Sequence, residues 1–423
     1  MSPVDILSAQ SGTARYACAS VEPEGKSRFA FLDGLRCLAI LTVVLFHYFS
    51  RWTPPNNPEN LYPYGHILLN FFQFGDFGVK LSFVISGFVI ALTLLKCNSI
   101  GEFFSRRFAR LFPAMFLCSI ITFVITSVIP DGHPFRVHII SFLPSWTFME
   151  PLMYNNLFST NIFDSVDGAY WSLYIEAEFY LLIATIYFLS REHFLRNLVA
   201  YSVVTFLLET ISGAFFLRTG SRLAHYVHWT MHFLQASDCL PWFLLGIGFF
   251  LYAKGKSPAQ WGAPLALGIT QLLIASGGKM IPALVALAIT GIFYTAMTLP
   301  ILGRILSYNP LVQTGRASYP LYLLHQNAGV TLIRFFSREF GLGVAASATF
   351  AFVLALMMIA FSRAIFQLYE RQANAFLLKI LVKRDAVRQE SFIPTHPNSF
   401  AMQAIVPITP QEDDSTLLIA AKP

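Results

Sequence analysis

The stretch Arg28–Tyr48, RFAFLDGLRCLAILTVVLFHY, begins polar and then runs apolar up to a histidine near its end. Asp33 and Arg36 lie three residues apart in the polar part, and His47 follows the apolar run. Eleven steps along the chain lead from Arg36 to His47. On an α-helix they make three turns plus about 20° and a rise of roughly 16 Å. The stretch therefore predicts a helix with an arginine at a membrane surface and, on the same face, a histidine deep in the apolar layer. Ionisable groups are costly there and tend to be functional.

The composition of the whole chain is that of an integral membrane protein. Of its 423 residues, 55% are hydrophobic and only 12% are charged, and the mean hydropathy is +0.57. Soluble domains carry about 25% charged residues. The formal net charge is +6, with the basic residues spread along short loops, which indicates membrane topology and not nucleic-acid binding.

Apolar segments recur along the chain and predict an all-α fold, a polytopic transmembrane helical bundle of about ten spans. The basic residues between positions 106 and 110 favour a cytoplasmic connection there by the positive-inside rule, so both termini are expected to be cytoplasmic. After the opening helix, the predicted spans are Gly78–Leu95, Leu111–Val128, Trp171–Leu189, Leu198–Leu217, Leu240–Tyr252, Ala263–Ser276, Pro282–Leu299, Tyr319–Phe336 and Val344–Tyr369.

Polar segments flank the predicted bundle. We expect residues 1–27 to form a disordered cytoplasmic N-terminal tail and residues 28–372 to form the membrane domain. Residues 373–423 are polar and proline-bearing, and are expected to be a cytoplasmic, largely disordered tail. The five cysteines show no CxxC spacing or pairing pattern.

Three histidines, His225, His228 and His232, lie at i, i+3 and i+7 and can share one helix face, as a metal site requires. Tyr226 and Trp229 lie among them, which is typical of an amphipathic helix at a membrane interface. We favour the interfacial helix and predict no metal site.

The segment LDGLRCLAILTVVLFH, residues 32–47, resembles the opening motif of the acyltransferase 3 family of integral-membrane O-acyltransferases, in which ten residues separate the arginine from the histidine. Four later segments resemble further motifs of that family in the family's order. They are VKLSFVISGFVI at Val79–Ile90, RRFARLFP at Arg106–Pro113, WSLYIE at Trp171–Glu176 and ASYPLYLLH at Ala317–His325. Each motif alone is weakly specific, but five in order over residues 28–370 are a strong signal.

The resemblance has three departures. Cys37 lies where the family usually has glycine or another small residue, and Ala177 lies where it has a second acid. Glu178 is about 200° around the helix from Glu176 and cannot replace that acid on the same face. The proline that often follows the glutamate at position 370 is missing.

The resemblance implies that His47 is a general base that takes the proton of an acceptor hydroxyl. The alternative is a buried histidine satisfied by a hydrogen bond. For Arg36 the resemblance implies contact with the acyl donor or with a developing oxyanion. The alternative is an interfacial side chain that pairs with Asp33. Arg36 and Asp33 are both included among the catalytic candidates.

Arg106, Arg107 and Arg110 match the basic motif and are candidates for binding the phosphates of coenzyme A, because guanidinium forks suit phosphate oxygens. They are equally well explained as positive-inside residues. Glu176 is expected to orient a histidine or bind a sugar hydroxyl; its alternative is a helix-end charge facing water. The remaining candidates are expected to line the substrate cavity: Ser86, Trp171 and His325. The alternative for His325 is a hydrogen bond to a neighbouring helix.

The resemblance implies a membrane O-acyltransferase that moves an acyl group, expected to be acetyl, from cytoplasmic acyl-CoA to a hydroxyl of a cell-surface or exported carbohydrate such as lipopolysaccharide or exopolysaccharide. Its partners would be the bilayer of a bacterial inner membrane, acyl-CoA as co-substrate and the carbohydrate, with no permanently bound cofactor. The alternative is a proton-coupled transporter or flippase that uses Arg36, His47, Glu176 and His325 as a proton relay. Inverted repeats would favour the transporter, and none is visible in the sequence.

Overall fold

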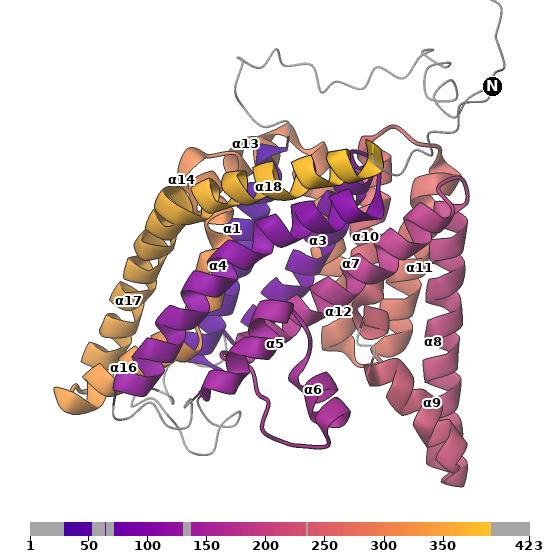
Figure 1. Cartoon of the computed structure of the whole chain (residues 1–423). Coiled ribbons are helices and arrows are strands. Elements are labelled where there is room, and N and C mark those ends of the chain that lie inside the picture. The colour runs from indigo at the N-terminus through magenta and orange to yellow at the C-terminus, as the bar shows by residue number, and fades with distance from the viewer. Residues whose placement is uncertain (1–28, 53–63, 65–71, 130–136, 234–235, 391–423) are drawn as a thin grey trace, which may run out of the picture.

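The computed structural model describes residues 29–52, 64, 72–129, 137–233 and 236–390, and this part of the chain is helical with no strands. Long helices run side by side, and short helices gather at both ends of the bundle (Figure 1). The long helices are α1 (Ala30–Phe49), α3 (Phe77–Leu94), α4 (Ile100–Val128), α7 (Trp171–Leu189), α8 (Phe194–Thr219), α10 (Ala236–Ala253), α11 (Pro258–Ala275), α12 (Met280–Thr298) and α17 (Val344–Ile365).

Seven helical stretches of the described chain are long and apolar enough to cross a bilayer. They are Ala30–Phe49, Gln73–Leu94, Ile100–Val128, Gly168–Leu189, Phe194–Thr219, Met280–Thr298 and Val344–Val382, with Cys239–Ala253 as a shorter apolar helix. The all-α membrane architecture predicted from the sequence is confirmed. The count of ten spans and the cytoplasmic side of the termini stay predictions.

Helix α1 packs against α3, α13 (Pro300–Leu306) and α14 (Asn309–Arg316). Two glycines allow the backbones to touch. A Cβ on Gly34 would overlap the carbonyl of Leu306, and one on Gly315 would overlap the carbonyl of Asp33. Small residues at such crossings are a usual way to bring membrane helices together. The charged start of α1 is therefore held firmly against α14.

Helix α4 begins at Ile100, eleven residues before the predicted start at Leu111, so the basic segment 106–110 is helical and not a loop. Ser99 accepts a hydrogen bond from the Glu102 N–H at 3.1 Å, and Glu102 accepts one from the Asn98 N–H at 2.9 Å. These two bonds satisfy backbone N–H groups around the N-cap residue Ser99 and fix the start of the helix. The prediction read the charges as a loop signal and missed the capping residues.

The predicted span Tyr319–Phe336 is broken into two helices, α15 (Ser318–Leu324) and α16 (Asn327–Glu339). Gln326, at φ −80° and ψ −81°, lies outside the helical region of backbone conformation. Polar side chains at the break bond to a different part of the chain, as described below, and this compensates the backbone groups that a continuous helix would satisfy.

The predicted disordered tail is wrong for residues 373–390. A π-helical turn, η5 (Phe366–Glu370), carries the chain from α17 into α18 (Arg371–Glu390). Helix α18 packs against α4 and lies across the same end of the bundle as α13 and α14 (Figure 1). The buried Glu370 anchors this turn by pairing with Arg110. The predicted N-terminal tail 1–27 and residues 391–423 lie outside the described residues.

Candidate functional site

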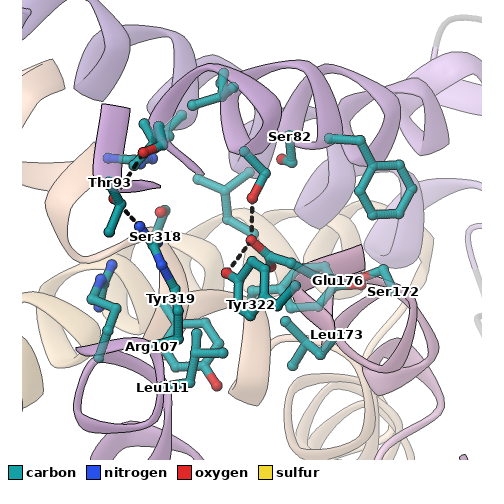
Figure 2. Close-up of a pocket in the computed structure, with 18 of the residues that line it drawn as sticks. Ser82, Thr93, Arg107, Leu111, Ser172, Leu173, Glu176, Ser318, Tyr319 and Tyr322 are labelled. Carbon is teal, nitrogen blue, oxygen red and sulfur yellow. Dashed lines mark hydrogen bonds between the residues drawn. The ribbon is translucent and has the colours of Figure 1, made fainter. Parts of the chain in front are cut away.

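A cavity of about 440 Å³ opens among α1, α3, α4, α7, α15 and α18. Figure 2 shows Thr93 and Arg107 on one side of it and Glu176 and Ser172 on the other. The volume lies in the range of small-molecule sites. One wall is cationic, and the arginines that form it are Arg36, Arg106, Arg107 and Arg110.

The four arginines differ in how their charges are compensated. Arg106 pairs with Glu102 at 2.7 Å, and Arg110 pairs with Glu370. Arg36 pairs with Asp33 at 2.9 Å, and that carboxylate also binds the exposed Arg316 at 3.2 Å.

Arg107 is held by neutral groups. It donates to the Thr93 hydroxyl, and its guanidinium carbon lies 5.6 Å from the ring centre of Phe103 and 5.4 Å from that of Tyr180. A hydroxyl and two ring faces orient a guanidinium without cancelling its charge. Arg107 is therefore the cavity arginine best prepared to attract an anion.

The opposite wall carries hydroxyls and one carboxylate. Glu176 accepts hydrogen bonds from Ser86 and, at 2.6 Å, from the Tyr180 hydroxyl. The Tyr322 hydroxyl lies 2.6 Å from the carbonyl of Ala169 and 2.7 Å from the Ser172 hydroxyl. Because the carbonyl can only accept, Tyr322 donates to it and Ser172 donates to Tyr322.

Two histidines from distant parts of the chain meet beyond this wall. His325 Nε2 lies 3.2 Å from His47 Nδ1, and the two rings are edge to face at 4.8 Å between centroids. His47 Nδ1 lies 2.9 Å from the carbonyl of Val43, and His325 Nδ1 lies 2.7 Å from that of Tyr322.

These contacts assign the tautomers of both rings. A carbonyl oxygen only accepts, so Nδ1 carries the proton in each histidine. His325 Nε2 then holds a lone pair and accepts from His47 Nδ1–H. The lone pair of neutral His47 is consequently on Nε2, which is the arrangement a general base requires.

The cavity ends one layer before the histidine pair. On α15 the last residue lining it is Tyr322, whose ring packs on His325 with centroids 5.4 Å apart. On α1 the last is Ile40, and His47 lies seven residues further, about 10 Å along the axis. Tyr322 therefore separates the arginine-lined cavity from the histidines.

The predicted site residues fall into three groups. The cavity brings together Arg36, Ser86, Arg106, Arg107, Arg110 and Glu176. His47 and His325 form the pair behind Tyr322. Asp33 and Trp171 do not line this cavity. Trp171 is 46% exposed and packs edge to face on Phe83, whereas the next residue, Ser172, lines the cavity, so a role of Trp171 in substrate binding stays a prediction.

Several lining residues were not anticipated from the sequence: Thr93, Tyr180, Ser172, Tyr319, Tyr322, Asn374 and Leu378. Tyr322 precedes His325 by three residues, and this spacing alone places both on one helix face. Asn374 and Leu378 were missed because α18 was taken for a disordered tail.

The histidines considered for a metal site lie elsewhere, on α9 (Arg222–Phe233). His225 packs on the ring of Phe216, and His228 Nδ1 lies 3.3 Å from the carbonyl of Glu209. Within the described residues, no three histidine, cysteine or acidic side chains are grouped as metal ligands.

The sequence of this chain is similar to those of known proteins. The acyltransferase 3 family, described as an acyltransferase domain, matches residues 29–366. The putative peptidoglycan O-acetyltransferase YrhL of Bacillus subtilis is 28% identical over 342 residues, which are 70% of this chain and 47% of that protein.

Two other relatives match over shorter regions. An O-acetyl transferase of Shigella phage Sf6 is 28% identical over 153 residues, 36% of this chain and 43% of the relative. The O-acetyltransferase OatA of Staphylococcus aureus is 28% identical over 181 residues, 40% of this chain and 26% of the relative. The chain thus matches less than half the length of each relative. No solved structure matches the chain at a significant level. Because the family match covers most of the chain and agrees with the five motifs, the chain belongs to the acyltransferase 3 family.

Proposed function

We propose that the protein is a membrane O-acetyltransferase that moves an acetyl group from acetyl-CoA to a hydroxyl of a cell-surface or exported carbohydrate. The observation that carries the proposal is the His47–His325 pair, in which the lone pair of His47 is on Nε2; the pair lies behind Tyr322, one layer beyond a cavity with an arginine wall. Family membership and relatives named O-acetyltransferases support the reaction class.

The cavity has the chemistry of a coenzyme A site. Arg107 offers a guanidinium whose charge is not cancelled by a carboxylate partner at hydrogen-bond distance, and Arg110 and Arg106 extend the cationic wall. Phosphates bind well to such forks. Helices α13, α14 and α18 lie at one end of the bundle (Figure 1), and α18 lines the cavity together with these arginines. We therefore propose that this end of the bundle faces the cytoplasm of a bacterial inner membrane, where acyl-CoA is found.

Arg36 belongs to the donor side in this proposal. It lies about 16 Å along α1 from His47, which is longer than an arginine side chain. A group at that distance cannot stabilise an oxyanion beside His47. It can bind the phosphate or pantetheine part of a donor whose thioester extends toward Tyr322.

The chemical step then follows from the tautomers. His47 Nε2 takes the proton of the acceptor hydroxyl as its oxygen bonds to the thioester carbonyl carbon. The C–S bond breaks, and the departing thiolate takes the proton from His47, so the products are the ester and free coenzyme A. His325 keeps Nδ1–H of His47 in place through both proton transfers.

The test is mass spectrometry of surface glycans from strains that carry the wild type, His47→Ala or no protein. We expect acetylation with the wild type alone. Equal acetylation with His47→Ala would exclude the base, and identical glycans in all three strains would exclude this acceptor class. A proton-flux assay on reconstituted vesicles tests the transporter alternative, which requires flux without acetyl-CoA.

A further inference from the structure

The carboxylate of Asp167 joins two distant segments next to the histidine pair. Asp167 is fully buried, in the turn before η4 (Gly168–Tyr170). Its Oδ1 accepts from the Ala169 N–H at 2.8 Å, and its Oδ2 accepts from the Asn327 N–H at 2.7 Å. Asn327 in turn donates from Nδ2 to the carbonyl of Val166 at 3.0 Å. These bonds link positions 160 residues apart.

The Asn327 end of this link is the break between α15 and α16. Asn327 is the first residue of α16, whose leading N–H groups have no acceptor within the helix. Asp167 provides one, and a carboxylate at a helix N-terminus is also favoured by the helix dipole. The break is therefore fastened by a side chain from the α7 side of the molecule.

The loop that contains Asp167 also bonds to Tyr322, on the other side of His325 from Asn327. The carbonyl of Ala169 accepts from the Tyr322 hydroxyl at 2.6 Å, and the Ala169 N–H is the second donor to Asp167. His325 lies between Tyr322 and Asn327 and thus between two fastened points. Its Nε2 reaches His47 at 3.2 Å, near the limit of a hydrogen bond, so a small shift of the turn would break that contact.

We propose that Asp167 is a positioning residue for acyl transfer: it holds the turn at 325–327 so that His325 keeps its contact with His47 Nδ1–H and, together with the Val43 carbonyl, orients the His47 ring. This inference rests on the proposed function. A carboxylate is needed because its two oxygens serve N–H groups on two segments. An asparagine offers one acceptor oxygen and turns an N–H₂ group toward the other donor.

The kinetic test uses the full-length protein in proteoliposomes with acetyl-CoA and a carbohydrate acceptor. We expect Asp167→Ala to lower kcat about 10²-fold, the loss typical of a misplaced reacting group, with the KM for acetyl-CoA changed less than twofold. Asp167→Asn, which keeps one of the two bonds, is expected to lower kcat about tenfold. A rise in KM with unchanged kcat would overturn the proposal.

A double-mutant comparison separates positioning from general stability. If Asp167 acts through His325, adding Asp167→Ala to His325→Ala lowers kcat less than twofold further. Losses that multiply would show that Asp167 acts elsewhere. If Asp167→Ala does not fold, Asn327→Ala takes its place in the same comparison. That variant removes the side-chain bond to Val166 and the weak bond from the Gln326 amide, keeps the main-chain bond to Asp167, and is expected to lower kcat several-fold.

Hydrogen exchange tests the clamp without activity. Asp167→Ala is expected to speed amide exchange in peptides covering 322–330 and to leave peptides from 177–189 of α7 unchanged. Unchanged exchange at 322–330 would overturn the clamp. A wild type that transfers no acetyl group from acetyl-CoA would instead overturn the proposed function, so the two failures are distinguishable.

Discussion

The arginine-lined cavity and the histidine pair handle charge in opposite ways. The cavity gathers four guanidiniums, of which three are compensated by the carboxylates Asp33, Glu102 and Glu370. The histidine pair is neutral and is held by main-chain carbonyls and by ring contact. A phosphate-bearing donor needs the first environment and a proton acceptor needs the second. Tyr322 keeps them apart, and this division can be tested one side at a time.

The largest effect is expected on the histidine side. His47→Ala should lower kcat by about 10²–10⁴-fold, the usual contribution of a general base, with little change in the KM for acetyl-CoA because the cavity is intact. Initial rates of acetyl transfer in proteoliposomes measure both constants. An effect that appeared only in KM would mean that His47 takes part in donor binding. The proposed division between a donor-binding cavity and a histidine base would then be wrong.

The arginine side should respond in KM and not in kcat. Arg107→Gln is expected to raise the KM for acetyl-CoA about tenfold or more, since a hydrogen bond to a charged group contributes about 1.5–3 kcal/mol. Acetyl-pantetheine, which lacks the nucleotide phosphates, should bind the variant and the wild type equally.

Two other arginines calibrate that result. Arg106→Gln should have a smaller effect, because Arg106 is paired with Glu102 and is 40% exposed. Arg196→Gln, an exposed position on α8 outside the cavity, is the matched control and should leave the KM unchanged. Equal effects of all three substitutions would indicate that the cavity arginines serve only as positive-inside residues and do not bind the donor.

The ring of Tyr322 separates the cavity from the histidine pair, and removing it should join the two spaces. Tyr322→Ala is expected to raise the rate with butyryl-CoA relative to acetyl-CoA several-fold, because the space beside His325 becomes continuous with the cavity. Tyr322→Phe keeps the ring and loses the hydroxyl bonds to Ala169 and Ser172, so its acyl preference should stay close to the wild type. A preference that is identical in all three proteins would show that the partition lies elsewhere.

The smallest expected effect is on stability and concerns Asp167, which lies just before the α7 span. Burial raises the pKa of Asp167 to about 7, although the backbone N–H groups of Ala169 and Asn327 act to lower it. The unfolded carboxyl titrates near 3.9. Because the pKa of Asp167 is higher in the folded protein than in the unfolded one, its carboxyl group contributes to the free energy of unfolding below about pH 4. This contribution is lost as the pH rises to 7.

Thermal unfolding in detergent at pH 5 and pH 8 measures this dependence. The midpoint of the wild type should fall with rising pH relative to that of Asp167→Asn, whose side chain does not titrate. Parallel curves for the two proteins would contradict a raised pKa at this position.

Much of the candidate site could be predicted from single segments. The polar start and apolar run of Arg28–Tyr48 indicated a membrane helix with Arg36 and His47 on one face, and α1 carries both residues. Three prediction errors arose where local signals misled. The charges at 106–110 suggested a loop, the polar composition after residue 372 suggested disorder, and the apolar run 319–336 hid a break.

The sequence by itself determined that the chain is a helical membrane protein, the family to which it belongs, and the order of arginine and histidine along α1. Composition, helical period and motif order are local properties, and they can be read without partners. Only the tertiary structure decided which distant residues meet: His47 with His325, Arg110 with Glu370 and Asp167 with Asn327.

The physical reason lies in the solvent. Lipid tails are as apolar as the helix surfaces, so burying an apolar face does not specify its neighbour. Sparse polar and small residues choose the neighbours instead, and these residues lie far apart in the chain. The arginines of the cavity and the two histidines were therefore visible as separate motifs, whereas the turn at 325–327 became visible only in the folded bundle.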